Sequence, residues 1–112
     1  IVIMGDFNST EYINKGSHYD RFKNEVSSMN LTDSTSKLKC TSYWWGGTRD
    51  QMQYPSTLDH ILVSTKLIGK KKFKTFQYGH CKKLNCEISD ERTMGVSFDE
   101  VSDHCPIVTE IE

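Results

Sequence analysis

The sequence has no long hydrophobic run, and this absence excludes a helix that crosses a bilayer within the chain. Its apolar stretches, such as Ile61–Val63 and Pro106–Val108, are far shorter than the roughly 20 residues that such a helix needs. Proline is scarce as well: Pro55 and Pro106 are the only two, and each precedes an apolar run, where a proline can open a strand. Neither sign of charge dominates. Because the net charge is −1, charge alone neither favours nor excludes a polyanionic partner.

What remains is the composition of a small folded domain. The 112 residues are 36% hydrophobic and 26% charged, which is neither a disordered nor a fibrous composition. The first residues, Ile1 to Asp6, form a β-branched run that leads into a polar turn, with no initiator Met before it. We therefore expect the chain to begin inside a larger protein, so that the lack of a leader says nothing about location.

Apolar periodicity predicts one helix and several strands. The helix follows from apolar residues at three- and four-residue spacing, namely Tyr19, Phe22, Val26 and Met29. We expect Ser17 to cap this helix and Asn30 to lie near its end. Runs of β-type residues predict strands at 1–4, 58–64, 73–78 and 105–111, and a further β-type segment at 40–45 stops at a Gly pair. The polar segment 32–39 predicts a loop, and the whole pattern is typical of a layered α/β or α+β fold.

Four cysteines leave three interpretations open. Cys81 and Cys86 enclose a short polar segment, so a local disulfide is plausible in an oxidising compartment and would favour a secreted or periplasmic protein over a cytoplasmic one. A metal site that uses His80, Cys81, Cys86 and Cys40 is the second interpretation, and free thiols are the third. Cys105 opens an apolar strand, and we expect it to be a small buried side chain.

Lysines are concentrated in one stretch of the chain. Seven of them lie between Lys66 and Lys83, where no Asp or Glu occurs, while acidic residues collect from Glu87 to Glu112. Such a block could contact phosphates. An equally good interpretation is a solvated strand edge on which lysines prevent pairing with another strand.

Three short segments place acidic, amide or imidazole groups at the tips of apolar strands. They are Gly5–Asn8, Leu58–Ile61 and Ser102–Pro106. Carboxylates beside an imidazole suit a metal-assisted attack of water on phosphate, because hard oxygen ligands hold Mg²⁺ and the metal offsets charge on phosphate oxygens. Taken singly, each segment also fits a simpler structure, such as an Asx turn or a surface ion pair.

In this order, the three segments resemble the C-terminal signature motifs of the endonuclease/exonuclease/phosphatase superfamily. This superfamily includes DNase I-like nucleases, abasic-site endonucleases, deadenylases, bacterial sphingomyelinases and inositol-phosphate 5-phosphatases. The resemblance spans Ile3 to Ile107, although only about twenty positions are specific to the signature. It implies that residues 1–112 are the C-terminal half of a four-layered α/β sandwich, with a mostly antiparallel mixed sheet flanked by helix.

The resemblance also implies a role for each matching residue in a Mg²⁺-dependent hydrolase, with Mn²⁺ or Ca²⁺ as alternative metals. Asp6 would orient or deprotonate the attacking water and contact the metal, and Asn8 would donate a hydrogen bond to the phosphate. His104 would stabilise negative charge in the transition state, Asp59 would hold its imidazole, and Asp103 would bind the metal or its hydration shell. The main metal-binding Glu of the family comes from an N-terminal half, so we expect the 112 residues alone to be inactive.

Two positions depart from the pattern of many relatives. Thr57 stands where an Arg is common, and His60 stands where a Tyr is common. Since neighbouring side chains on a strand face opposite ways, we expect His60 to point away from Asp59 and to pack or support the site. A plain buried ion pair between Asp59 and His104 is the structural alternative to the catalytic interpretation.

The residues before the middle motif bear on the substrate. Trp44, Trp45 and Arg49 could stack on a base or hold a flanking phosphate, whereas a simpler arrangement has one indole facing the core. With the lysine block, this favours a nuclease acting on DNA or RNA. The alternatives are a secreted phospholipid (sphingomyelinase-like) or inositol-phosphate phosphoesterase, and a non-catalytic half-domain that serves as a binding module.

Overall fold

The computed structural model describes residues 1–112, and it confirms the expected mixture of helix and antiparallel sheet. Strand β5 (Asp59–Ser64) lies at the centre of the first sheet, between β1 (Val2–Asp6) and β2 (Leu31–Asp33), and pairs antiparallel with both. Its side chains alternate between the two faces of the sheet, so neighbouring residues of β5 point in opposite directions. Both long apolar side chains at its centre, Leu62 and Val63, are buried.

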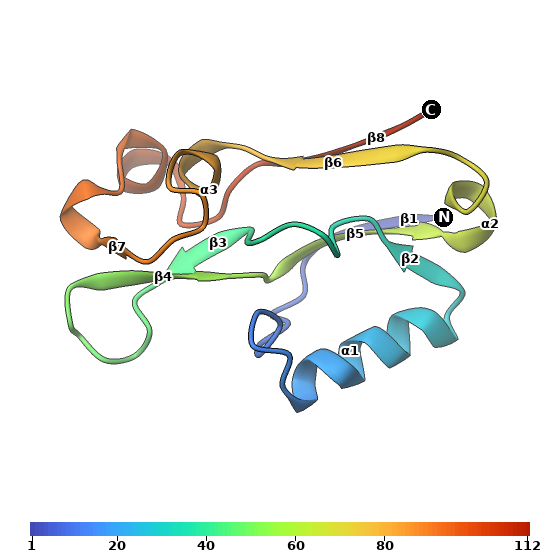
Figure 1. Ribbon diagram of the computed structural model, residues 1–112, viewed down its shortest axis with the longest axis horizontal. Helices are drawn as coiled ribbons and strands as arrows, with labels where there is room; N and C mark the ends of the chain where they lie inside the picture. Colours follow the sequence, from blue (N-terminus) through green and yellow to red (C-terminus); the bar gives the residue numbers. More distant parts are fainter.

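Two further antiparallel sheets complete the fold. Strand β4 (Met52–Ser56) pairs with β3 (Ser42–Trp44) and with the two-residue β7 (Ser89–Asp90), while β6 (Phe73–Gln77) pairs with β8 (Ile107–Ile111). In Figure 1, β4 and β5 follow one another almost in line along the molecule, interrupted only at residues 57–58. This interruption is the point at which the two halves of the molecule meet.

The elements form three layers, seen edge-on in Figure 1. The two-stranded β6–β8 sheet covers one face of the β1–β5–β2 sheet, and helix α1 (Ser17–Ser28) covers the other. Hydroxyl groups join the two sheets: Thr75 Oγ1 donates to the carbonyl of Ser34 at 2.7 Å, and Ser34 Oγ lies 2.8 Å from Thr109 Oγ1. No helix of the protein has the length and apolar character needed to span a membrane.

Short helices occupy the connections. Helix α2 (Thr65–Ile68) follows β5, and α3 (Gly79–Lys83) follows β6. A 3₁₀ turn (Glu91–Thr93) and a π-helical turn (Ser97–Val101) lie between β7 and β8. The long connection that the sequence predicts between its last two strands is therefore structured rather than irregular.

Several expected boundaries require correction. Ser17 does not cap helix α1: Gly16 is the N-cap residue, and Glu11 satisfies the helix start by accepting from the amide of His18 at 2.9 Å and the hydroxyl of Ser17 at 3.3 Å. The hydrogen bond from the His18 amide lowers the pKa of Glu11. The segment expected to be a loop from residue 32 begins within β2, and β4 has no counterpart among the expected strands, since Gln53 and Pro55 break its apolar pattern.

The expected disulfide between Cys81 and Cys86 is wrong. Cys40 is bonded to Cys86, and Cys81 is bonded to Cys105, so no cysteine is free. Helix α3 turns Cys81 into the core towards the start of the last strand, where Cys105 is buried as expected. The metal and free-thiol interpretations are excluded as well, because sulfurs bonded to each other provide no thiolate ligands.

The two disulfides lie in the core of the end of the molecule that contains α3. Cys40, Cys81 and Cys105 form one buried cluster with Tyr43 and Met94. Three of the ten buried apolar side chains in the protein are thus cysteines. A core with so few apolar side chains depends heavily on covalent cross-links.

Peptide mapping without reductant is expected to recover Cys40 joined to Cys86 and Cys81 joined to Cys105. Replacing Cys81 and Cys105 together by Ala should lower the free energy of unfolding by about 2–5 kcal/mol in urea denaturation, since the cross-link restricts the unfolded chain over a separation of 24 residues. Recovery of a Cys81–Cys86 peptide, or a double variant as stable as the parent, would contradict this pairing.

Candidate active site

The pairing of β1 with β5 places two carboxylates side by side. In this antiparallel register, Asp6 at the end of β1 lies directly opposite Asp59 at the start of β5. The ladder continues one step further, because the amide of Phe7 donates to the carbonyl of Leu58 at 2.8 Å. Both acidic groups therefore emerge at one edge of the sheet, at the junction between β4 and β5.

The segment 102–106 brings His104 to the same edge. Backbone hydrogen bonds join this segment to β3 and to the residue before it. The amide of Cys105 donates to the carbonyl of Thr41 at 2.8 Å, and the amide of Tyr43 donates to the carbonyl of Asp103 at 3.0 Å. His104 also forms an isolated bridge with Ser42. These backbone hydrogen bonds thus fix the position of His104 independently of the contacts that its imidazole makes.

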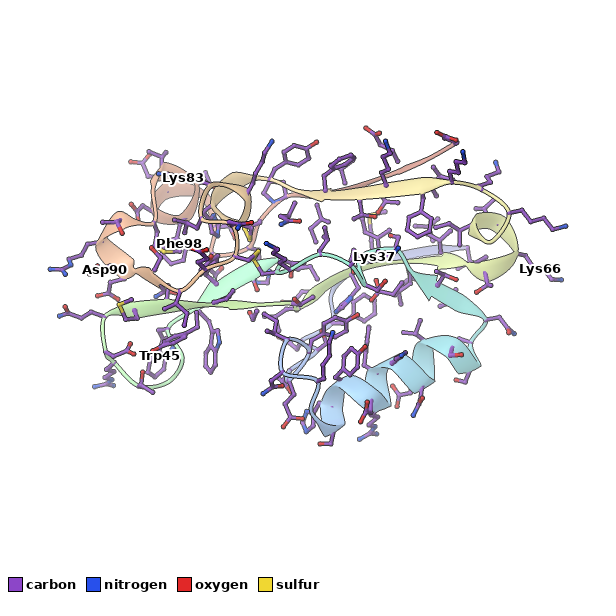
Figure 2. All side chains as sticks on the ribbon, viewed as in Figure 1. Lys37, Trp45, Lys66, Lys83, Asp90 and Phe98 are labelled. Carbon is purple, nitrogen blue, oxygen red and sulfur yellow. A yellow bond between two sulfur atoms is a disulfide. The ribbon has the colours of Figure 1, made fainter.

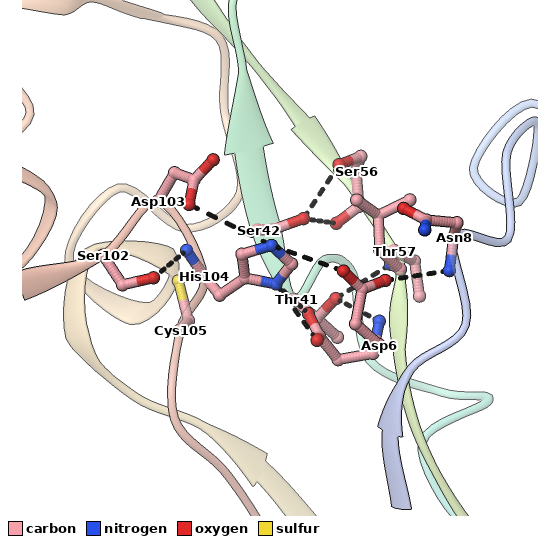
Figure 3. Close-up of polar contacts among 12 residues, drawn as sticks. Asp6, Asn8, Thr41, Ser42, Ser56, Thr57, Ser102, Asp103, His104 and Cys105 are labelled. Atoms are coloured by element: carbon pink, nitrogen blue, oxygen red, sulfur yellow. Dashed lines mark hydrogen bonds and ion pairs between the residues drawn. The ribbon is translucent and has the colours of Figure 1, made fainter.

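The imidazole of His104 lies among three carboxylates (Figure 3). Its Nδ1 is 2.8 and 3.0 Å from the two carboxylate oxygens of Asp59, while Nε2 is 3.7 Å from Asp6 Oδ2 and 4.0 Å from Asp103 Oδ1. The side chain of Asp59 is 17% exposed, against 40% for Asp6 and 61% for Asp103. The structure therefore brings together four of the five residues for which the sequence predicted a catalytic or metal-binding role, with one inner carboxylate on Nδ1 and two open ones near Nε2.

The charge of these carboxylates affects the protonation of His104. Partial burial acts to lower the pKa of His104, but the hydrogen bond and negative charge of Asp59, followed by the charges of Asp103 and Asp6, outweigh it and raise the pKa above the usual value for histidine. The imidazolium form is accordingly favoured, with Nε2 on the open side.

Thr41, which the sequence analysis missed, fixes the strand that carries Asp59. Its hydroxyl oxygen accepts hydrogen bonds from the amides of Leu58 and Asp59, at 3.0 and 3.1 Å. Thr41 is fully buried and adjoins Cys40, so a disulfide holds the neighbouring backbone. A single Thr next to a Cys carries no local pattern that would reveal this contact.

Asn8 lies in a tight turn beside Asp6. Its backbone amide donates to Asp6 Oδ1 at 2.8 Å, which is the Asx turn considered as the simpler alternative, and its φ of 49° is one that Asn tolerates well. The side-chain amide of Asn8 is exposed and makes no hydrogen bond within the protein. The turn thus coexists with a free amide that can bind a ligand.

His60 lies on the opposite face of β5, as expected, and belongs to a buried polar cluster beneath α1. Its Nδ1 lies 2.8 Å from Asp33 Oδ2, and its Nε2 lies 2.6 Å from Ser9 Oγ. The ring packs against the aromatic rings of Tyr12 and Phe22. Burial acts to raise the pKa of Asp33, but hydrogen bonds from His60 and Thr35 outweigh it and lower the pKa.

The hydroxyl of Ser9 links this cluster to the candidate site. It donates to the carbonyl of Thr57 at 2.7 Å while it contacts His60, so it joins the turn after β1 to the residue two before Asp59. Ser9, His60 and Asp33 have the order of a serine-nucleophile triad. These residues have a structural role, because Ser9 and His60 are buried and the hydroxyl proton of Ser9 is donated to the Thr57 carbonyl rather than to His60.

The aromatic and basic residues expected to bind substrate are divided between separate surfaces. Neither indole faces the core: Trp44 is 48% exposed and Trp45 is 47% exposed, while their neighbour Tyr43 is buried. Trp44 lines a groove of about 480 Å³ together with Asn8. Trp45 and Arg49 line a different groove, of about 430 Å³, that contains none of the acidic residues around His104.

The lysine block extends along the molecule rather than around His104. Figure 2 shows Lys66, in α2, at one end of the molecule and Lys83, the last residue of α3, towards the opposite end. Three members of the block, Lys71, Lys72 and Lys74, line a groove of about 680 Å³ with Lys37, beside β6. No lysine lines the groove that contains Asn8.

No family model, no curated protein and no solved structure matches the chain. The chemistry of the site is accordingly inferred from its residues and their geometry.

Replacing Asp59 by Asn is expected to lower the pKa of His104, because the substitution removes the carboxylate that faces Nδ1. An NMR titration of the His104 ring protons in EDTA measures this change. Asp20→Asn, on the exposed surface of α1, is the control and should leave the titration of His104 unaltered. An unchanged titration in Asp59→Asn would contradict the pairing.

The raised pKa of His104 also has a consequence for stability. A histidine whose folded pKa exceeds its unfolded value stabilises the fold fully below the unfolded value, and this contribution is lost as the pH rises through the folded value. The urea midpoint of the parent should therefore exceed that of Asp59→Asn most at pH values below the usual pKa of histidine, with a smaller difference above the raised pKa. A difference that grows with rising pH would oppose this assignment.

Replacing Ser9 by Ala should destabilise the protein by about 1–3 kcal/mol, because the buried Thr57 carbonyl and His60 Nε2 then lose their hydrogen-bond partner. Urea denaturation gives the value. Ser36→Ala, at an exposed position, should change stability by less than about 0.5 kcal/mol. Equal stability of the two variants would show that the Ser9 hydroxyl does not lock the turn.

Proposed function

We propose that this chain supplies part of the active site of a metal-dependent phosphoesterase of the endonuclease/exonuclease/phosphatase type, one that hydrolyses phosphodiester bonds in nucleic acid. The observation that carries the proposal is the position of His104 between Asp59 on one ring nitrogen and Asp6 and Asp103 on the other. These groups come from three distant segments of the chain. A structural ion pair requires only the contact between Asp59 and His104, and leaves the two open carboxylates unexplained.

In this proposal His104 acts as the cation that faces the phosphate. Asp59 binds Nδ1, orients the ring and favours its charged form. Nε2 can then donate a hydrogen bond to a phosphate oxygen and stabilise the negative charge that grows there in the transition state. His104 is 33% exposed, so a phosphate group can reach it.

Asp6 and Asn8 serve the other side of the scissile bond. One oxygen of Asp6 is held by the Asn8 amide, and the second lies on the side of His104 Nε2, where it can orient or deprotonate a water molecule. The free side-chain amide of Asn8 can donate to a second phosphate oxygen. The Asx turn fixes these two groups relative to each other, which reduces the entropy lost on reaching the reactive geometry.

The donor set suits Mg²⁺, with Mn²⁺ or Ca²⁺ as alternatives. Asp6 and Asp103 offer exposed carboxylate oxygens, whereas Asp59 is already committed to His104. Mg²⁺ commonly binds through one or two carboxylates and keeps several waters, so these two residues are a sufficient contribution from this chain. When bound, the metal would offset negative charge on the phosphate oxygens.

The surface around the site favours a nucleic acid as substrate. Trp44 presents a half-exposed indole in the groove that contains Asn8, and an indole provides a surface on which bases stack. A second groove is lined by four lysines, Lys37, Lys71, Lys72 and Lys74, and by two acidic residues, Glu110 and Glu112. Its excess of positive charge can attract a strand that extends beyond the site. The two disulfides fit an oxidising compartment.

A phospholipid phosphoesterase is the second candidate, and one observation favours it. Ile88, Val96 and Val101, on the turns between α3 and β8, are more than half exposed. Exposed apolar side chains of this kind can insert into a lipid surface. A substrate comparison decides between the two candidates.

The full-length translation product that contains these residues is expected to cleave plasmid DNA or RNA with Mg²⁺ and to lose this activity in EDTA. His104→Ala and Asp59→Asn should each lower kcat at least about 100-fold, since one removes the proposed phosphate-binding cation and the other removes the group that orients it. Initial rates on plasmid DNA, RNA, sphingomyelin and inositol phosphates give the measurement.

Asp99→Asn, an exposed acidic residue outside the site, is the matched control and should retain the parent rate. Hydrolysis by His104→Ala at more than half the parent rate would contradict the proposed role of His104 in catalysis. Preference for sphingomyelin over both nucleic acids would select the second candidate.

A further inference from the structure

The groove beside Asn8 has the size and position of a substrate-binding subsite. It holds about 480 Å³, within the range of about 300–1,000 Å³ found for small-molecule sites. The turn after β1, Trp44 of β3 and the β4–β5 junction form its walls. It reaches Asn8, two residues after Asp6, and Leu58, the residue before Asp59. Whatever occupies the groove therefore lies next to the proposed phosphate position.

Thr57 makes this groove more than a surface depression. The residue is only 2% exposed, and its hydroxyl oxygen has no hydrogen-bond partner. The other buried oxygen without a partner belongs to Gln53, which does not line this groove. A buried hydroxyl without a partner lowers the stability of the fold, and a ligand atom that accepts its hydrogen removes this penalty.

The charge of the lining decides what kind of group fits. No Lys or Arg lines the groove, and its one charged residue is Glu11, whose pKa is lowered by the hydrogen bond from the His18 amide so that the carboxylate stays ionised. A second phosphate would be repelled. Apolar surface from Trp44, Ile13 and Pro55 instead suits a neutral planar group.

We infer that the groove binds the base of the nucleotide whose phosphate lies at His104, with Trp44 as the stacking surface and the Thr57 hydroxyl as the donor to a carbonyl oxygen of the base. This inference rests on the proposed function and adds a specificity-determining residue to it. Thr57 selects bases that carry a carbonyl acceptor, and Glu11 keeps anionic groups out.

Nucleotide binding in EDTA tests the inference without turnover. The probes are dTMP, 2-deoxyribose 5-phosphate, which lacks the base, and a short-chain phosphocholine lipid, each followed by NMR at the Trp44 indole N–H and the amides of Asn8 and Thr57. Addition of dTMP should shift these signals, and its affinity should exceed that of the base-free phosphate at least about fivefold.

Two variants separate a binding role from a structural one. Thr57→Val and Trp44→Ala should each weaken dTMP binding about fivefold to tenfold. Without nucleotide, Thr57→Val should also raise Tm, because valine replaces the hydroxyl that has no partner with a methyl group. Ser36→Ala, at an exposed position outside the groove, removes a hydroxyl that makes no hydrogen bond within the protein, so this control should change neither quantity.

Equal binding of dTMP and the base-free phosphate would overturn the inference, and so would unchanged dTMP affinity in both variants. Shifts of the same signals by the phosphocholine lipid, with none by dTMP, would overturn it in favour of a lipid subsite. If Thr57→Val does not fold, Trp44→Ala decides alone, since that side chain is half exposed. The proposed function is tested separately by the rate at which His104→Ala hydrolyses nucleic acid. Thr57→Val and Trp44→Ala do not alter the residues around the imidazole, so the two tests can fail independently.

Discussion

The register of β1 on β5 is the constraint on which the rest of the site depends. It places Asp6 opposite Asp59. His60, one residue further along β5, points to the opposite face because side chains alternate along a strand. A slip of one residue would exchange the two faces, burying a carboxylate beneath α1 and exposing an aromatic-packed imidazole. Such a slip is costly because each face has its own partners: Asp33 and Ser9 for His60, and His104 for Asp59.

The two ends of the molecule make different contributions to this edge. One end supplies Asp6 and Asp59 through ordinary strand pairing beneath a helix. The other supplies His104 from a segment that is held by backbone bonds to β3 and by the disulfide of its neighbour Cys105. Because the apolar core of that end consists largely of the half-cystines around Tyr43 and Met94, the position of the imidazole depends on oxidation of the cysteines.

Polar groups in this protein fall into two classes that differ in how fully their hydrogen bonds are made. Ser9, Thr41 and His60 are buried and fully bonded, and they serve to hold the backbone around the site. Asn8 and Thr57 retain unused hydrogen-bonding groups beside one groove. The two groups differ in kind: the amide of Asn8 is exposed, whereas the buried hydroxyl of Thr57 has no partner and destabilises the fold unless a ligand accepts its hydrogen.

The sequence alone determined the strands with clear runs of β-type residues and the polar residues at their tips. Asp6, Asp59, Asp103 and His104 were predicted from their motifs, because a carboxylate or an imidazole at either end of an apolar strand is a local pattern. Only the tertiary structure decided the cysteine pairing, the contact of Thr41 with the amide of Asp59, and the unpaired hydroxyl of Thr57. These features join residues far apart in the chain or depend on a missing contact, and spacing along a sequence carries no information about either.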